Sequence, residues 1–137
     1  MTADITGTGP NGLWSDRTRQ RMEEIAAHIR DAVRALPEVG ESVDGFGHIV
    51  FKVGKKSFVL VGAGREGQGS LFIKSDPVSQ QMLIARGPYI RAPYIGQHGW
   101  VCVWGDVEVD WREVRELVRD AYRLVAPRKL LRKLGED

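Results

Sequence analysis

The fold is decided by one stretch of the sequence, Ile49-Val50-Phe51-Lys52-Val53-Gly54-Lys55-Lys56-Ser57-Phe58-Val59-Leu60. Two runs of β-branched and aromatic residues flank Gly54-Lys55, and glycine at the first turn position suits a two-residue hairpin with a type II′ turn. The hairpin predicts that Phe51 lies opposite Phe58 on one face of a sheet. Its tip then carries three lysines, Lys52, Lys55 and Lys56.

The patterns around this hairpin predict the remaining elements. Apolar residues at helical spacing, alternating strands and proline stops give this order: helix 16–36, strands 49–53, 56–60 and 70–74, helix 76–86, strand 99–104, helix 110–126 and a short helix near 130–134. Consecutive antiparallel strands with these helices predict an α+β domain whose helices pack on one face of an antiparallel sheet. We expect residues 15–137 to form this single domain, and residues 1–14 to form a flexible tail.

The charge of the chain is balanced overall but uneven along its length. The 137 residues include 20 Lys and Arg and 18 Asp and Glu, so the formal net charge is +2. Residues 48–105 nevertheless hold seven basic and two acidic side chains, and residues 112–133 hold eight and three. This composition excludes a histone-like tail and an acidic disordered protein, but it leaves two basic zones.

The cysteine content and the apolar runs restrict the setting of the protein. Cys102 is the single cysteine, which excludes an internal disulfide and a cysteine-rich metal site. The N-terminal sequence does not resemble a signal peptide, and no apolar run is long enough to cross a bilayer. We therefore expect a soluble, cytoplasmic protein that does not bind membranes.

The motifs that could carry chemistry are incomplete. Residues 62–67 match G-x-G-x-x-G after a strand, but another strand follows instead of the helix that a dinucleotide site needs. His28, His48 and His98 lack metal-ligand spacing, and no nucleophile with a catalytic partner can be assigned. We expect no metal, no cofactor and no enzymatic activity. His98 is the best candidate for an acid or base, although a structural hydrogen bond is the commoner role.

Basic residues on two elements suggest contacts with phosphate groups. The arginines of helix 110–126 recur every three or four residues, which predicts one stripe facing solvent. Such a stripe is often only a solvated face, and lysines at a hairpin tip often only prevent aggregation. Their coincidence predicts nucleic-acid binding by nine residues: Lys52, Lys55, Lys56, Arg91, Arg115, Arg119, Arg123, Arg128 and Lys129.

The loop at residues 88–100 supports an alternative function. Aromatic and polar side chains occur together in this loop, a composition typical of ligand pockets. These residues are Tyr89, Tyr94, Gln97, His98 and Trp100. They suit a protein- or small-ligand-binding adaptor, and they equally suit a loop that is pinned to the core.

Three segments of the second half carry a family resemblance: Ser75-Asp76-Pro77, Pro93-Tyr94-Ile95-Gly96-Gln97-His98-Gly99-Trp100-Val101 and Ala121-Tyr122-Arg123-Leu124-Val125-Ala126-Pro127. They resemble the MmcQ/YjbR family of small bacterial proteins over about residues 16–134. The resemblance implies a CyaY/frataxin-like fold and a DNA-binding protein with a double-wing arrangement. DNA is therefore the expected partner of a non-enzymatic protein. Many relatives have Asn-Lys where this chain has Gln97-His98, so a lysine of this loop is not among the expected phosphate contacts.

Overall fold

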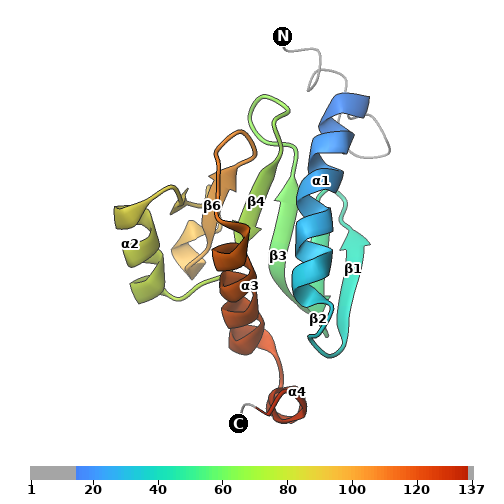
Figure 1. Cartoon of the computed structure of the whole chain (residues 1–137), viewed down its shortest axis with the longest axis vertical. Coiled ribbons are helices and arrows are strands. Elements are labelled where there is room, and N and C mark those ends of the chain that lie inside the picture. The colour runs from blue at the N-terminus through green and yellow to red at the C-terminus, as the bar shows by residue number, and fades with distance from the viewer. Residues whose placement is uncertain (1–14, 136–137) are drawn as a thin grey trace.

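The computed structural model describes residues 15–135 and contains a six-stranded antiparallel sheet (Figure 1). Its strands are β1 (Val39–Val43), β2 (Ile49–Val53), β3 (Lys56–Gly62), β4 (Ser70–Ile73), β5 (Ile90–Arg91) and β6 (Val101–Trp104), in the order β1-β2-β3-β4-β6-β5. The helices are α1 (Asp16–Val33), α2 (Pro77–Arg86), the short 3-10 helix η2 (Gly96–His98), α3 (Trp111–Val125) and α4 (Arg128–Lys133). This architecture confirms the predicted α+β class.

Helices α1 and α3 cover one face of the sheet, which we call the inner face (Figure 1). Apolar residues at helical spacing on α1, such as Ile25 and Ile29, meet those of α3, such as Val114 and Val118, over the strands. Burial of these side chains, at about 1.5–3 kcal/mol for each large one, is the main stabilising contribution in the domain. Helix α2 lies beside the β5 edge of the sheet (Figure 1).

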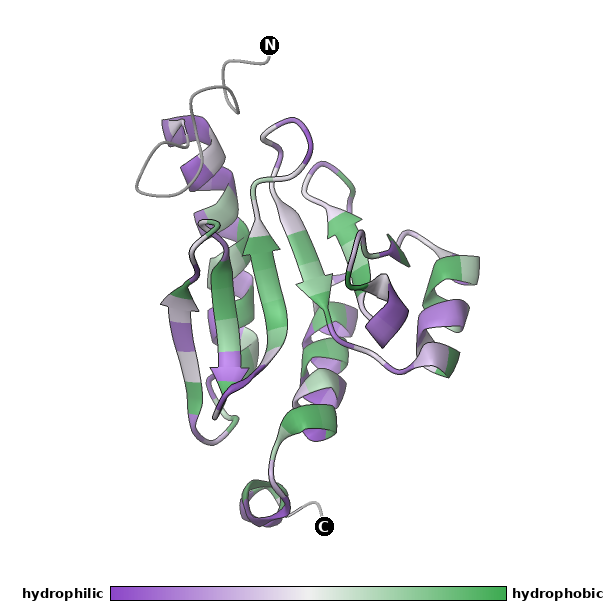
Figure 2. Ribbon diagram, turned by 180° about the vertical axis from the view of Figure 1, so that it is seen from behind, coloured by the Kyte–Doolittle hydropathy of each residue, from purple (hydrophilic) through white to green (hydrophobic). Residues whose placement is uncertain are grey.

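The opposite, outer face of the sheet carries a smaller apolar cluster. Because successive strand residues point to opposite faces, this cluster receives the alternate positions Leu60, Phe72, Cys102 and Trp104. Figure 2 shows the central strands of this face without a covering helix, with η2 and α2 to one side. The outer face is therefore the side on which the sheet itself can meet a ligand.

Helix starts follow the capping chemistry of the sequence. The Asp76 carboxylate accepts a hydrogen bond from the Ser79 backbone N–H at 2.9 Å and begins α2. The Asp110 carboxylate likewise accepts one from the Arg112 N–H at 2.9 Å. Side-chain acceptors at these positions satisfy backbone donors that have no partner within the helix. Both predicted starts are confirmed.

The hairpin has the predicted two-residue turn but a different register. Val53 pairs with Lys56 around the turn, yet Phe51 lies opposite Val59 rather than Phe58, because the register shifts between Phe51 and Lys52. The shift is a bulge that places Phe58 beside Val59 in the inner cluster, where both are fully buried. Core packing therefore overrides the simple pairing that turn length predicts.

Strands β1 and β5 were not predicted, and α1 ends at Val33 rather than at residue 36. Four of the five residues of β1 are exposed, so this edge strand lacks an alternating apolar pattern. Strand β5 has only two residues, too few for any pattern. Helix α1 ends at Val33 because Arg34 and Leu36 donate to the carbonyls three residues back, Asp31 and Val33, so the chain tightens out of the α-helix before Pro37.

The predicted tail at residues 1–14 lies outside the described residues, as do residues 136–137. Within residues 15–135, no helix combines the length and the apolar character needed to cross a bilayer.

Candidate nucleic-acid interface

The β2–β3 turn presents the three predicted lysines to solvent. Gly54 has φ +61°, a backbone conformation that glycine adopts without steric cost, and it turns the chain sharply. Lys52, Lys55 and Lys56 are all exposed, and none of them is ion-paired to a carboxylate among the described residues. Their ammonium groups are therefore available to an external anion.

Helix α4 presents a second set of cations at the same end of the molecule. The β2–β3 turn and α4 both lie toward one end of the long axis (Figures 1 and 2). Leu130 is buried in the inner cluster and anchors α4, which leaves Arg128 and Lys129 exposed. Neither of these two cations is ion-paired to a carboxylate within residues 15–135. We call Lys52, Lys55, Lys56, Arg128 and Lys129 the basic end.

The arginines of α3 lie mainly on the solvent side, as their spacing predicts, but carboxylates compensate two of them. Arg115 is ion-paired to Asp31 of α1, and Arg123 is ion-paired to Asp120. Arg119 is half-buried rather than exposed. The prediction considered one helix alone, whereas α1 packs beside α3 and supplies a carboxylate. These arginines contribute less net positive charge than the basic end.

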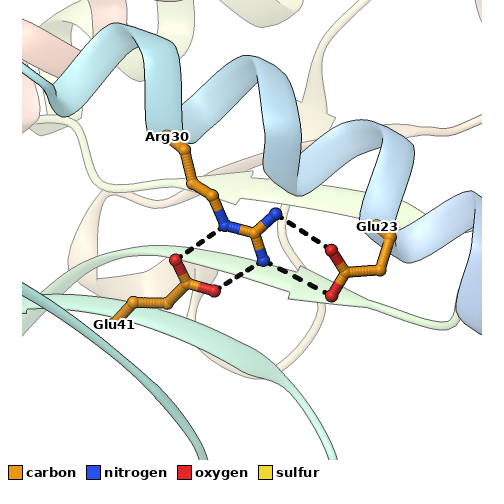
Figure 3. Close-up of polar contacts among 3 residues, drawn as sticks. All are labelled: Glu23, Arg30 and Glu41. Atoms are coloured by element: carbon orange, nitrogen blue, oxygen red, sulfur yellow. Dashed lines mark hydrogen bonds and ion pairs between the residues drawn. The ribbon is translucent and has the colours of Figure 1, made fainter.

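Acidic partners also hold the edge of the sheet to α1. Arg30 donates hydrogen bonds to Glu41 of β1 at 2.7 and 2.8 Å and to Glu23 at 2.9 Å (Figure 3). The hydrogen bond from Arg30 lowers the pKa of the Glu41 carboxyl, although its partial burial opposes this shift. Two carboxylates share one guanidinium here, so the cluster has a net charge of −1; it ties β1 to α1 and offers no free cation to a polyanion.

The five predicted residues of loop 88–100 do not form one site. Tyr89 is buried in the inner cluster and Trp100 in the outer cluster, whereas Tyr94 is 95% exposed. Gln97 and His98 are exposed on η2. The loop is attached to α2, because the buried Gln80 amide of that helix donates hydrogen bonds to the carbonyls of Gly96 and Trp100.

Burial changes the chemistry of Tyr89. It raises the pKa of Tyr89 to about 12, and the nearby Glu113 carboxylate adds to this shift. Within residues 15–135, the Tyr89 hydroxyl nevertheless makes no hydrogen bond of normal distance and angle. Arg91, predicted to contact phosphate, is exposed, and its side chain lies against Gly96. Tyr94 alone of the predicted loop residues lines a large groove.

This outer-face groove has a volume of about 780 Å³ and was not predicted. It lies over β3, β4 and β6, between the β1–β2 loop and the segment before η2. Aromatic side chains dominate its lining, with one arginine: Phe46, His48, Phe72, Tyr94, Trp104 and Arg65. These residues come from five separate segments, so no local sequence pattern could have grouped them.

The His48 side chain is held in place at the groove by Asp44. The Nδ1 atom of His48 lies 2.9 Å from the Asp44 carboxylate, which also accepts the backbone N–H groups of Phe46 and His48. Partial burial alone would raise the pKa of Asp44, but these hydrogen bonds lower it. Asp44 therefore stays ionised and orients the imidazole.

The described residues offer little to a metal or a nucleophilic mechanism. No three His, Cys, Asp or Glu side chains within residues 15–135 come close enough to hold a metal ion. Burial raises the pKa of the Cys102 thiol to about 12, so the reactive thiolate is not formed near neutral pH. Residues 62–67 join β3 to β4, with no helix at the position that a dinucleotide site requires.

Comparison with known proteins agrees with this architecture. The YjbR family model matches residues 34–124. The chain belongs to the YjbR family. The structure is similar to the crystal structure of protein DR2400 of Deinococcus radiodurans, whose domain is assigned to the family model DUF419, with a TM-score of 0.66 and 24% identity. That similarity covers 82% of this chain and 88% of the other. No curated protein matches the chain.

Membership of the YjbR family fits the resemblance seen in the sequence. The matched residues 34–124 include the hairpin, the outer-face groove and most of α3, but they stop before α4. The hairpin half of the basic end thus belongs to the family region, and the α4 half lies beyond it. At 24% identity, the similar crystal structure shows the fold alone.

Proposed function

We propose that this YjbR-family protein binds DNA without catalysing a reaction, through phosphate contacts at the basic end. One observation carries the proposal: five exposed cations lie toward one end of the molecule, and none is ion-paired to a carboxylate within the described chain. The arginines of α3 serve as the internal contrast, because carboxylates compensate Arg115 and Arg123. A cytoplasmic setting belongs to the same proposal, since the only cysteine is a buried thiol.

Uncompensated surface cations suit a polyanion for a general electrostatic reason. Each phosphate that a Lys or Arg neutralises releases a condensed counterion, so the affinity falls as salt rises. A cation already paired to a carboxylate contributes less binding free energy, because it must share or break that pair to contact a phosphate. Four of the five members of the basic end are lysines, which contact phosphates as point charges, and Arg128 alone has a planar guanidinium, so most of this contact is sequence-independent.

A salt titration of duplex DNA binding tests the proposal. The full chain should bind a short duplex at low ionic strength, and the logarithm of the affinity should fall linearly with the logarithm of the salt concentration. Replacing Lys55 and Lys56 together by Gln should weaken binding and flatten that slope by up to ~0.9 for each lost phosphate contact.

The matched control is Arg112→Gln, which removes an exposed cation at the N-terminal start of α3, away from the basic end. It should leave both the affinity and the salt slope close to those of the unmodified chain. Absence of binding even at low ionic strength would show that the proposed function is wrong. Equal losses in the control and in the lysine variant would move the contact away from the hairpin.

A further inference from the structure

We propose that the outer-face groove stacks unpaired nucleobases, so that the protein binds single-stranded nucleic acid with bases in the groove and phosphates on nearby cations. The inference rests on the proposed function and names the form of nucleic acid that the protein prefers. It is carried by the groove itself, which combines exposed aromatic rings, an arginine and a lining without carboxylates.

Two aromatic side chains at the groove are exposed in a way that packing does not explain. Tyr94 is 95% exposed and Phe46 is 73% exposed, although both line the same groove. They come from different segments, the loop before η2 and the β1–β2 loop. Large apolar side chains that gather on one concave surface mark a binding surface more often than isolated ones do. Flat rings that are open to solvent are what a nucleobase stacks on.

The backbone at Tyr94 gives a second reason to assign it a binding role. Its φ is +64°, in the left-handed region that bulky side chains rarely adopt. A tight turn imposes this angle, since the Gly96 N–H donates to the Ala92 carbonyl at 3.0 Å. Glycine or asparagine would satisfy the turn with less strain, so a tyrosine here is costly to folding. Strained residues that contribute no packing are characteristic of ligand sites.

The floor of the groove is suited to flat rings with polar edges. The Arg65 guanidinium lies 4.8 Å from the centre of the Trp104 ring, which places a cation and an aromatic face together. Phe72 and Leu60 add apolar surface beside them. The His48 ring and the Ser70 hydroxyl lie close to Gly62. A methyl group added to the Gly62 Cα would lie 3.2 Å from the ring and 2.9 Å from the hydroxyl. The partly exposed His48 imidazole can hydrogen-bond the edge of a stacked base, whereas Ser70 is buried and shapes the floor.

Charge favours a nucleic acid over other partners with flat rings. Lys52 points to the outer face, because its neighbours Phe51 and Val53 belong to the inner cluster. Lys74 lies on the same side, with its Nζ atom 5.9 Å from the Trp100 ring. In the six described strands the only acidic side chain is Glu41, which binds Arg30 of α1. Phosphates that follow the stacked bases along the strands would therefore meet Lys52 and Lys74, while the Asp44 carboxylate beside the groove is already hydrogen-bonded to His48.

Binding of labelled single strands tests the inference. The probes are an oligothymidylate of ~12 nucleotides, an oligouridylate of the same length and a duplex of the same length, each measured by fluorescence anisotropy over a salt series. Tyr94→Gly should lower the affinity for the single strands by about 5- to 150-fold, the loss expected for one base stack. Its salt slope and its duplex affinity should not change, because no phosphate contact is lost.

Three further variants make the result specific. Phe46→Ala should lower single-strand affinity in the same way, and Tyr94→Trp should preserve it, because stacking needs only the ring. Met82→Ala removes a side chain that is as exposed as Phe46 but lies on α2 outside the groove, and it should change nothing. An oligodeoxyuridylate added to the series isolates the effect of the sugar, because thymine carries a 5-methyl group that uracil lacks.

The outcomes separate this inference from the proposed function. If the chain binds duplex and single strands with a normal salt slope while Tyr94→Gly and Phe46→Ala match the unmodified chain, the stacking inference is overturned and phosphate binding stands. If no nucleic acid binds at low ionic strength, both fail together. If Phe46→Ala loses single-strand binding and its melting temperature also changes, the result for Tyr94→Gly decides. That variant relieves strain and should not lower stability.

Discussion

Two tyrosines differ in whether the hydroxyl group has a hydrogen-bond partner, and this difference predicts how each hydroxyl contributes to stability. The Tyr122 hydroxyl donates to the Pro37 carbonyl at 2.8 Å, and its ring packs edge-on against Phe58. The Tyr89 hydroxyl is buried without a hydrogen-bond partner within residues 15–135. We therefore expect Tyr122→Phe to lower the free energy of unfolding by ~1 kcal/mol. Tyr89→Phe should leave it unchanged or raise it, because the variant removes an unsatisfied buried group. Urea denaturation of both variants measures the contrast, and equal losses would contradict it.

Strand β1 is the element whose attachment depends most on charge, since most of its side chains face water. Its Glu41 is bonded to Arg30, which lowers the pKa of the carboxyl. A depressed pKa adds stability that is present above the pKa of the unfolded carboxyl and is lost as pH falls through the folded value. Glu41→Gln should thus cost well under ~1 kcal/mol at neutral pH, because the pair is partly exposed. The cost should shrink as the pH falls below about 4.3, the pKa of an unfolded glutamate, and disappear once the pH is below the lowered pKa of the folded carboxyl. Thermal unfolding over a pH series from neutral to acid tests this, and a loss that does not shrink with falling pH would count against it.

The elements also show what the sequence could and could not predict. Helix starts at Asp76 and Asp110 were predictable, because a cap involves residues only two or three positions apart. The bulge at Phe58 was not, since it depends on how the hairpin packs under α3. The groove residues Phe46, Arg65 and Tyr94 lie far apart in the chain, and only the sheet brings them together. Interactions between neighbouring residues can be predicted from the sequence, whereas a site assembled from several strands can be recognised only once the fold is known.

At the scale of the whole molecule, the net charge is only +2, yet five uncompensated cations of the described chain gather at the basic end. The two halves of the basic end belong to different elements, the hairpin and α4. If both touch one DNA duplex, the affinity losses of the hairpin double variant (Lys55→Gln with Lys56→Gln) and the α4 double variant (Arg128→Gln with Lys129→Gln) should add in free energy when combined. Their salt slopes should flatten in the same additive way.

The control for this additivity is a third double variant with the same change in charge, Arg115→Gln with Arg123→Gln. Because both arginines are already compensated by carboxylates, its loss should be clearly smaller than that of either half of the basic end. A loss confined to the hairpin variant would restrict DNA to the family region, residues 34–124, and leave α4 outside the interface. Full additivity would instead make α4, which lies beyond that region, part of the surface that binds. The distribution of compensated and uncompensated cations, rather than their number, then determines where this protein meets a polyanion.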